Sequence, residues 1–151
     1  FQMSSVEFFT MVKEHLKENG VMVVNMNMRG SGKGNINAYL SDTIASVFNN
    51  VYTVDVNGST NRELFASENE QMLQTFQNKT AALDNRELKE LMLDVSEQSK
   101  LYHAGKYIMT DDKAPVELLG MQVIDQLIRE EVAYYKKIYE KDGITGLLEQ
   151  L

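Results

Sequence analysis

The fold class is decided by the stretch Val21-Met22-Val23-Val24-Asn25-Met26-Asn27-Met28, an almost continuous apolar run that is rich in β-branched residues. This pattern is typical of a strand that is covered on both faces, as the strands of a parallel sheet are. Upstream, apolar side chains recur at helical spacing and predict a helix over about residues 5–18, which ends at Asn19-Gly20. Ser4 or Ser5 can cap this helix, and Glu7 stands at the capping-box distance from Ser4.

Downstream of this strand, the pattern predicts a crossover helix and two further strands. A glycine-rich turn at residues 30–34 leads into an amphipathic helix that ends at Asn49-Asn50. Val51–Val56 is predicted as the second strand, and Asn57-Gly58 begins a turn toward a third strand, Glu63–Ser67. The second and third strands should form an antiparallel hairpin, whereas the first two should be parallel. The expected sheet is therefore mixed, with about three strands.

The second half of the chain is expected to be mainly helical. Residues 70–82 are polar and ambiguous, whereas an amphipathic helix is predicted near residues 84–100 and a short extended piece at Lys106–Met109. Pro115 stands where a first-turn proline is tolerated, so a long helix should run from about residue 115 to residue 141. Asp142-Gly143 then breaks it. The fold class is thus α/β, with flanking helices and a long C-terminal helix.

Composition narrows the classes of function. A length of 151 residues with 43% hydrophobic content fits a single domain with a real core. The formal net charge of −7 argues against nucleic acid as a partner, because phosphate binding depends on clustered Lys and Arg. The absence of cysteine excludes thiolate catalysis and fits a reducing, intracellular compartment. No apolar run approaches the ~18 residues that a membrane-spanning helix requires.

The glycine-rich turn Gly30-Ser31-Gly32-Lys33-Gly34 lies between a strand and a helix, as the phosphate-binding loop of a dinucleotide site does. Asp55, at the end of the next strand, stands near the position of the acid that binds ribose in such sites. The glycine spacing is G-x-G-x-G, however, whereas the fingerprint requires G-x-G-x-x-G. The turn also lacks the Lys-Ser or Lys-Thr pair of a P-loop. An ordinary loop is therefore the favoured interpretation.

A cluster of acids, Asp111, Asp112 and Glu117, surrounds the predicted start of the long helix. Such carboxylates can hold an amine substrate through charge-assisted hydrogen bonds. The alternative is capping, because acids at a helix N-terminus are stabilised by the helix dipole and need no ligand. Spacing alone favours capping and leaves substrate binding open.

The remaining chemistry-bearing residues predict no catalytic, metal-binding or cofactor-binding site. His15 and His103 are far apart and belong to no zinc-binding pattern, and no Ser-His-Asp set stands out. His15 is expected near the C-terminus of its helix, where an imidazolium interacts with the dipole. Tyr134, Tyr135 and Tyr139, at helical spacing, are interpreted as a packing face rather than a stacking platform.

Several motifs, taken in order, resemble those of spermidine synthase-like proteins. Residues 7–25 resemble the family stretch E-F-F-x-x-V-x-x-x-L-x-x-x-G-V-x-x-x-N, residues 40–52 a later crossover helix and strand, and residues 64–67 a reversed last strand. The most specific match is Thr110-Asp111-Asp112-Lys113-Ala114-Pro115-Val116-Glu117, which resembles the family's T-D-D-x-A-P-V-E. The resemblance covers most of the chain except a variable middle at about residues 70–105.

This resemblance implies a partial Rossmann-like fold of the class I methyltransferase and spermidine synthase type, in which the reversed seventh strand lies between strands five and six. Residues 21–28 are then strand five, 51–56 strand six and 63–67 strand seven. The first four strands, with the cofactor loop, the ribose-binding acid and the catalytic base, lie upstream of Phe1, which itself resembles a cut inside a longer protein. The edge of strand 21–28 is thereby unpaired, and because such an edge recruits another strand, a homo-oligomer or a covered edge is expected.

The resemblance also implies an organisation into one domain, 1–151, that forms the C-terminal part of a spermidine synthase-like domain. Residues 1–69 supply the order α-β-α-β-β, residues 70–109 a variable helical insertion, and residues 110–151 the acidic motif and C-terminal helix. The function implied is that of a portion of a polyamine aminopropyltransferase, inactive on its own and located in the cytoplasm. The family's fused branch joins this domain to membrane helices, which leaves attachment of the parent protein open.

In the complete protein, the resemblance implies decarboxylated S-adenosylmethionine as cofactor, or S-adenosylmethionine in a related methyltransferase, together with a polyamine or other small amine. No cofactor is expected in the fragment itself. Asp111, Asp112 and Glu117 are the residues expected to contact the substrate. The alternative is a non-catalytic interaction or scaffold domain, which binds a protein partner through the strand at residues 21–28 or through the tyrosine face.

Overall fold

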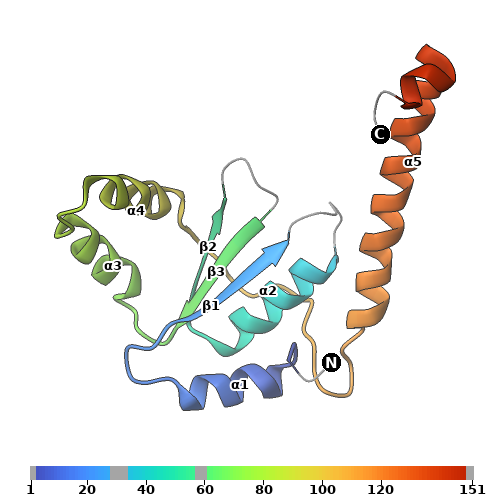
Figure 1. Cartoon of the computed structure of the whole chain (residues 1–151). Coiled ribbons are helices and arrows are strands. Elements are labelled where there is room, and N and C mark those ends of the chain that lie inside the picture. Colours follow the sequence, from blue (N-terminus) through green and yellow to red (C-terminus); the bar gives the residue numbers. More distant parts are fainter. Residues whose placement is uncertain (1–2, 28–33, 57–60, 149–151) are drawn as a thin grey trace.

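The computed structural model describes residues 3–27, 34–56 and 61–148, which form a sheet with helices on both faces and one long helix that extends from its side (Figure 1). The first half contains α1 (Val6–His15), β1 (Met22–Asn27), α2 (Ile36–Val47), β2 (Asn50–Asp55) and β3 (Asn61–Ser67). The second half contains α3 (Met72–Ala81), α4 (Arg86–Gln98), β4 (Lys100–Leu101) and α5 (Val116–Leu148).

The strands lie in the order β1-β3-β2-β4, and every strand pair is antiparallel. The predicted β2–β3 hairpin is confirmed. The predicted parallel pairing of the first two strands is wrong. β1 and β2 do point in the same direction, but the hairpin places β3 between them, so they form no hydrogen bonds with each other. This order is the one that the family resemblance implies for a reversed strand between its two neighbours.

The boundaries of several elements differ from those predicted. The expected continuation of the first strand through Met28, the glycines at 30–33 and the turn at 57–60 lie outside the described residues. The ambiguous segment at 70–82 forms α3, whereas Lys106–Met109 forms no strand. Instead, the two residues of β4 pair with β2. In α5, Gly143 has a φ of 64° and interrupts the helix where the break is predicted, because glycine adopts this conformation at little cost.

The hydrophobic core lies between the sheet and the helices α1 and α2. Its buried side chains are Phe9, Met26, Ile44, Phe48, Val51, Leu64 and Ala66. Along β1, Met22 and Val24 pack against this core, whereas Val23 on the opposite face is 54% exposed. The expectation that this strand is covered on both faces is therefore wrong for the described residues. An apolar run in the sequence predicts a strand, but it does not show which faces of that strand are covered by helices.

The long helix α5 contacts the rest of the molecule near its first turns, where Leu119 is buried (Figure 1). Further along, it exposes the apolar side chains of Met121, Ile124, Ile128, Val132, Tyr134 and Tyr139. The interpretation of the tyrosines as a packing face is wrong here, since Tyr134 and Tyr139 are more than half exposed. None of the helices in the described part of the chain combines the length and apolarity needed to span a membrane.

Candidate functional site

The two aspartates of the T-D-D-x-A-P-V-E motif occupy the centre of a tight turn, Thr110–Lys113, called here the acidic turn. Two backbone hydrogen bonds close it: Lys113 N donates to Thr110 O at 2.9 Å, and Thr110 N donates to Lys113 O at 3.4 Å. Asp111 and Asp112 are both exposed. The turn lies between residues 102–109, which form no regular secondary structure, and the first turn of α5.

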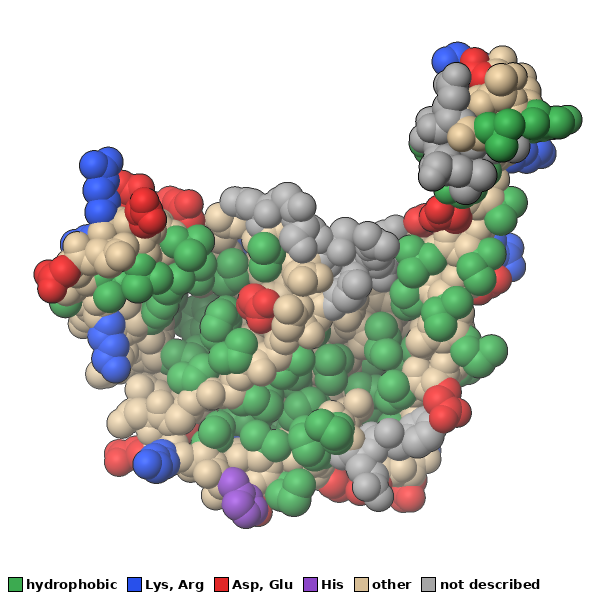
Figure 2. Space-filling model, viewed as in Figure 1, with side chains coloured by type: hydrophobic (Ala, Val, Ile, Leu, Met, Phe, Trp, Pro, Cys, Tyr) green, Lys and Arg blue, Asp and Glu red, His purple; other side chains and the backbone are tan. Residues whose placement is uncertain are grey.

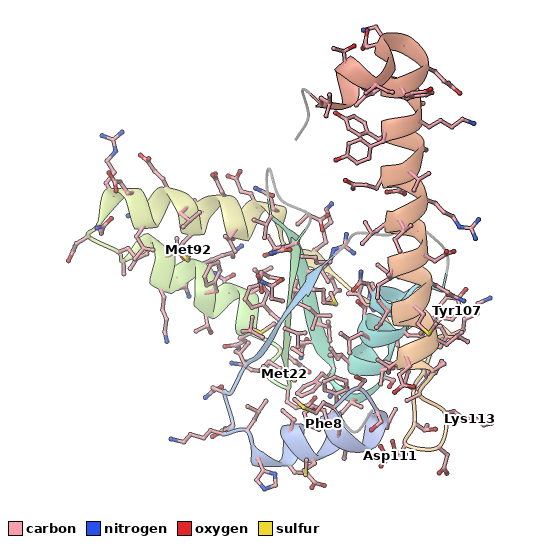
Figure 3. All side chains as sticks on the ribbon, turned by 45° about the vertical axis from the view of Figure 1, so that its right-hand side comes forward. Phe8, Met22, Met92, Tyr107, Asp111 and Lys113 are labelled. Carbon is pink, nitrogen blue, oxygen red and sulfur yellow. The ribbon has the colours of Figure 1, made fainter. Side chains whose placement is uncertain are left out.

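The acidic turn is fastened to the N-terminus of α1 (Figure 3). Ser5 Oγ donates to Asp111 Oδ1 at 2.5 Å, and Asp111 N donates to Glu7 Oε2 at 3.1 Å. Val6, which precedes Glu7, donates from its backbone N to Met109 O at 2.9 Å. Ser5 is fully buried and is also the N-cap of α1, so one hydroxyl both caps a helix and holds Asp111. The capping interpretation is thus corrected for Asp111, which supports the cap of α1 rather than that of α5.

Asp112 and Glu117 have different surroundings. Asp112 lies at the tip of the acidic turn, whereas Glu117 lies in the first turn of α5, and both are exposed. Asp111 and Asp112 are neighbours because they are consecutive in the acidic turn, and Glu117 follows further along the chain, on α5.

A buried carboxylate that the sequence analysis missed positions the segment leading to the acidic turn. Asp42 on α2 is 3% exposed, and its two oxygens accept hydrogen bonds from Tyr102 Oη at 2.6 Å and from Tyr107 N at 3.0 Å. The neighbouring Thr43 Oγ1 accepts from Met109 N at 2.9 Å. Burial and the hydrogen bond to Asp42 raise the pKa of Tyr102 to about 12. We call this arrangement the Asp42 clamp.

The Asp42 clamp also depends on a glycine. The backbone of Gly105 passes so close to α2 that a Cβ atom there would lie 2.5 Å from Asp42 Oδ2. The sequence carries a signal for this arrangement, because three consecutive polar residues, Ser41-Asp42-Thr43, stand between the apolar Leu40 and Ile44. Periodicity alone assigns such residues to a solvated face, so the signal is visible only once their burial is known.

The acidic turn does not lie at the carboxyl ends of β1 and β2, where ligands bind in open α/β sheets. Both strands end toward the top of Figures 1 and 3, whereas Asp111 lies at the bottom, beside α1 and below the first turns of α5. The acidic turn is therefore placed by its contacts with α1 and by the start of α5, not by the ends of the strands.

Asp55, at the end of β2, is not available as a ribose-binding acid. Arg62 of the neighbouring strand donates to both of its oxygens, from Nε at 2.5 Å and from Nη2 at 3.1 Å. This hydrogen bonding from Arg62 holds the pKa of Asp55 below its ordinary value. Of the glycine-rich turn, Gly34 is described, and it packs against the ring of Tyr107. Among the described residues, no three His, Cys, Asp or Glu side chains are grouped so as to hold a metal ion.

Comparison with known proteins identifies a relative. Over an aligned length of 169 residues, the chain is 48% identical to a protein of Bifidobacterium longum (strain NCC 2705) named a probable polyamine aminopropyl transferase. The match covers 98% of this chain but 37% of the relative. No protein-family model matches the chain, and no solved structure matches it. The resemblance to spermidine synthase-like proteins is thereby confirmed: this chain is a relative of a probable polyamine aminopropyl transferase and spans 37% of its length.

Proposed function

We propose that this chain is the C-terminal portion of a spermidine synthase-like aminopropyltransferase of polyamine biosynthesis. The observation that carries the proposal is the 48% identity to a probable polyamine aminopropyl transferase over 98% of the chain. The strand order β1-β3-β2 supports an assignment to strands five, seven and six of a Rossmann-like sheet. On this assignment, the chain contributes one side of an active site to which the rest of the enzyme contributes the other.

In this proposal, Asp111, Asp112 and Glu117 contact the substrate amine. Their carboxylates accept charge-assisted hydrogen bonds from ammonium groups. The Ser5 hydroxyl and the Asp42 clamp act as positioning groups, because they fix the backbone that presents Asp111. A substrate held in this way would present a deprotonated amine nitrogen to the carbon next to the cofactor sulfonium, whose C–S bond would break as the C–N bond forms.

Decarboxylated S-adenosylmethionine does not fit the described residues of this chain. The molecule is cationic at its sulfonium and at its amine, and its ribose calls for an acid. A pocket beneath α3 and α4, with a volume of about 500 Å³, is lined by Lys79 and by no carboxylate, while Asp55 is already paired with Arg62. We therefore place the cofactor site outside these residues and expect no transferase activity from the chain alone.

The amine-binding role is tested in the complete transferase by replacing the exposed acids. Asp112→Asn and Glu117→Gln should each raise KM for putrescine by about tenfold while changing kcat less, since a charge-assisted hydrogen bond contributes roughly 1.5 kcal/mol. Product formation is followed by mass spectrometry of spermidine and methylthioadenosine. Glu131→Gln, an exposed acid in the middle of α5, is the matched control and should leave KM unchanged.

Two results would contradict the proposal. One is an unchanged amine KM in both Asp112→Asn and Glu117→Gln. The other is tight binding of decarboxylated S-adenosylmethionine to this chain alone in a calorimetric titration, which would place a cofactor site within it.

A second candidate function, an interaction domain, is supported by the exposed edge of the sheet. β1 is the first strand in the order, and among the described residues no strand pairs with its outer edge. We propose that this edge pairs with a second copy, because unpaired edges recruit other strands. Sedimentation should then detect a dimer of the chain, and Val23→Lys, at a position that is 54% exposed, should dissociate it. A monomer at all concentrations would exclude this role.

A further inference from the structure

A pocket lies on the opposite face of the sheet from α1 and α2, where α3 and α4 lie over β2 and β3. Its volume of about 500 Å³ is within the range of small-molecule sites. Figure 2 shows this hollow as an apolar recess between the α3–α4 part of the molecule and the sheet. It begins near Val21 and Asn69, where β1 starts and β3 has ended, so it lies toward the opposite end of the sheet from the carboxyl ends of β1 and β2.

The lining of the pocket includes three aromatic side chains. Tyr52 and Phe65 are cross-strand partners in the sheet, and Phe76 lies on α3. Aromatic rings provide flat apolar surfaces against which a planar molecule can stack. This composition favours a flat, largely apolar ligand over a flexible polar one.

The charge of the pocket is opposite to that of the chain as a whole. The protein has 22 acidic and 15 basic residues, yet the pocket lining contains Lys79 and no acid. Lys79 forms no salt bridge with any of the described residues, so its ammonium group is available to a ligand. A cationic amine would be desolvated there without a counter-ion, which is unfavourable. An anionic group, in contrast, gains a partner.

The rim of the pocket is preorganised by side-chain amides. Asn69 Nδ2 donates to Asn19 Oδ1 at 2.9 Å, and Asn69 Oδ1 accepts from Gln71 N at 2.8 Å. These bonds join the connection before β1 to the start of α3. A rim that is fixed before binding reduces the entropy that a ligand must overcome.

We propose that this pocket is a second binding site, separate from the amine site, for a planar aromatic molecule that carries a single anionic group. The proposal is independent of the transferase function, because it uses no residue of the acidic turn. The anionic group lies near Lys79, and the rings lie against Phe65, Tyr52 and Phe76.

The test uses two fluorescent probes that differ in charge: 8-anilinonaphthalene-1-sulfonate and its uncharged analogue N-phenyl-1-naphthylamine. The complete chain should bind one equivalent of the sulfonate saturably, and a tenfold excess of spermidine should not displace it. Thr75→Trp, which places a ring in the pocket, should weaken binding by about tenfold or more. Gln74→Trp, the adjacent α3 position outside the lining, is the matched control and should leave binding unchanged.

The contribution of Lys79 is measured separately. Lys79→Gln should weaken binding of the sulfonate about two- to fivefold, as expected for an exposed ion pair, and should not weaken binding of the uncharged analogue. Chemical-shift mapping on the unmodified chain should place the sulfonate at Tyr52, Phe65 and Lys79, and not on α5. The proposal is overturned if Thr75→Trp and Gln74→Trp have equal effects, if the shifts map to α5, or if Lys79→Gln affects both probes alike.

Discussion

The two faces of the sheet are packed differently. On one face, α1 and α2 bury Phe9, Ile44 and Leu64 almost completely; on the other, α4 contains no buried residue and Val23 of β1 stays 54% exposed. The well-packed face carries the motifs that resemble the family, and it also holds the acidic turn through Ser5 and the Asp42 clamp. The open face carries the segment without resemblance and the aromatic pocket. The well-packed face thus positions the acidic turn, whereas the open face leaves space for the pocket.

The largest expected effect comes from a cavity in the well-packed face. Ile44→Ala removes a completely buried side chain and should lower the free energy of unfolding by about 2–5 kcal/mol. Leu91→Ala, on the open face, removes a side chain that is 56% exposed and should change it by about 0.5 kcal/mol or less. Urea unfolding followed by circular dichroism measures both. Equal losses in the two variants would show that the faces are packed alike.

The second effect tests the Asp42 clamp. Asp42→Ala leaves the Tyr102 hydroxyl and the Tyr107 N–H without their acceptor and should cost about 1–3 kcal/mol. The pKa of Tyr102 should also fall, because the hydrogen bond to Asp42 and the negative charge of Asp42 are removed while the burial of Tyr102 remains. Absorbance of tyrosinate at 295 nm during alkaline titration measures this fall. Asp94→Ala, an exposed acid on α4, should change neither quantity.

The same tyrosine predicts how stability depends on pH at the alkaline end. Its pKa is about 12 in the folded chain against an ordinary 10.0, so the folded state retains a proton that the unfolded state loses. The stability that Tyr102 contributes is therefore fully present below pH 10 and is lost as the pH rises toward 12. Asp42→Ala should reduce this loss. If the free energy of unfolding fell equally between pH 10 and pH 12 in the two proteins, the hydrogen bond from Tyr102 to Asp42 would be contradicted.

Helix and strand types follow from periodicity, whereas the contacts that build the site do not. The apolar spacing around Phe9 and Ile44 is local, so it predicts α1 and α2 directly. The Asp42–Tyr102 hydrogen bond joins residues 60 positions apart, and nothing in the spacing of either residue points to the other. Likewise, the hairpin indicates that β2 and β3 pair, but only the tertiary structure, or a resemblance to a known fold, indicates that β3 also pairs with β1.

A smaller effect is expected at the cap that links α1 to the acidic turn. Ser5→Ala removes the acceptor for Phe8 N and the donor to Asp111, and should cost about 1 kcal/mol, as the loss of an N-cap does. Amide hydrogen exchange should also become faster at Val6 and Asp111, since both belong to the same junction. Ser4→Ala, the alternative cap in the sequence, should leave stability and exchange unchanged. The reverse result would assign the cap to Ser4.

The smallest effect is expected at the exposed ion pair between Asp55 and Arg62. Asp55 is the last residue of β2, and Arg62 is the second residue of β3. Because the side chain of Asp55 is 53% exposed, solvent screens its attraction to Arg62, and Asp55→Asn should cost between about 0 and 1 kcal/mol at neutral pH. The hydrogen bond from Arg62 lowers the pKa of Asp55 below 3.8 in the folded state, so this contribution is present above that pH and is lost as the pH falls below it. The stability curves of the two proteins should therefore converge under acid conditions. A constant difference across the whole pH range would show that Asp55 stabilises the strand pair by packing rather than by charge.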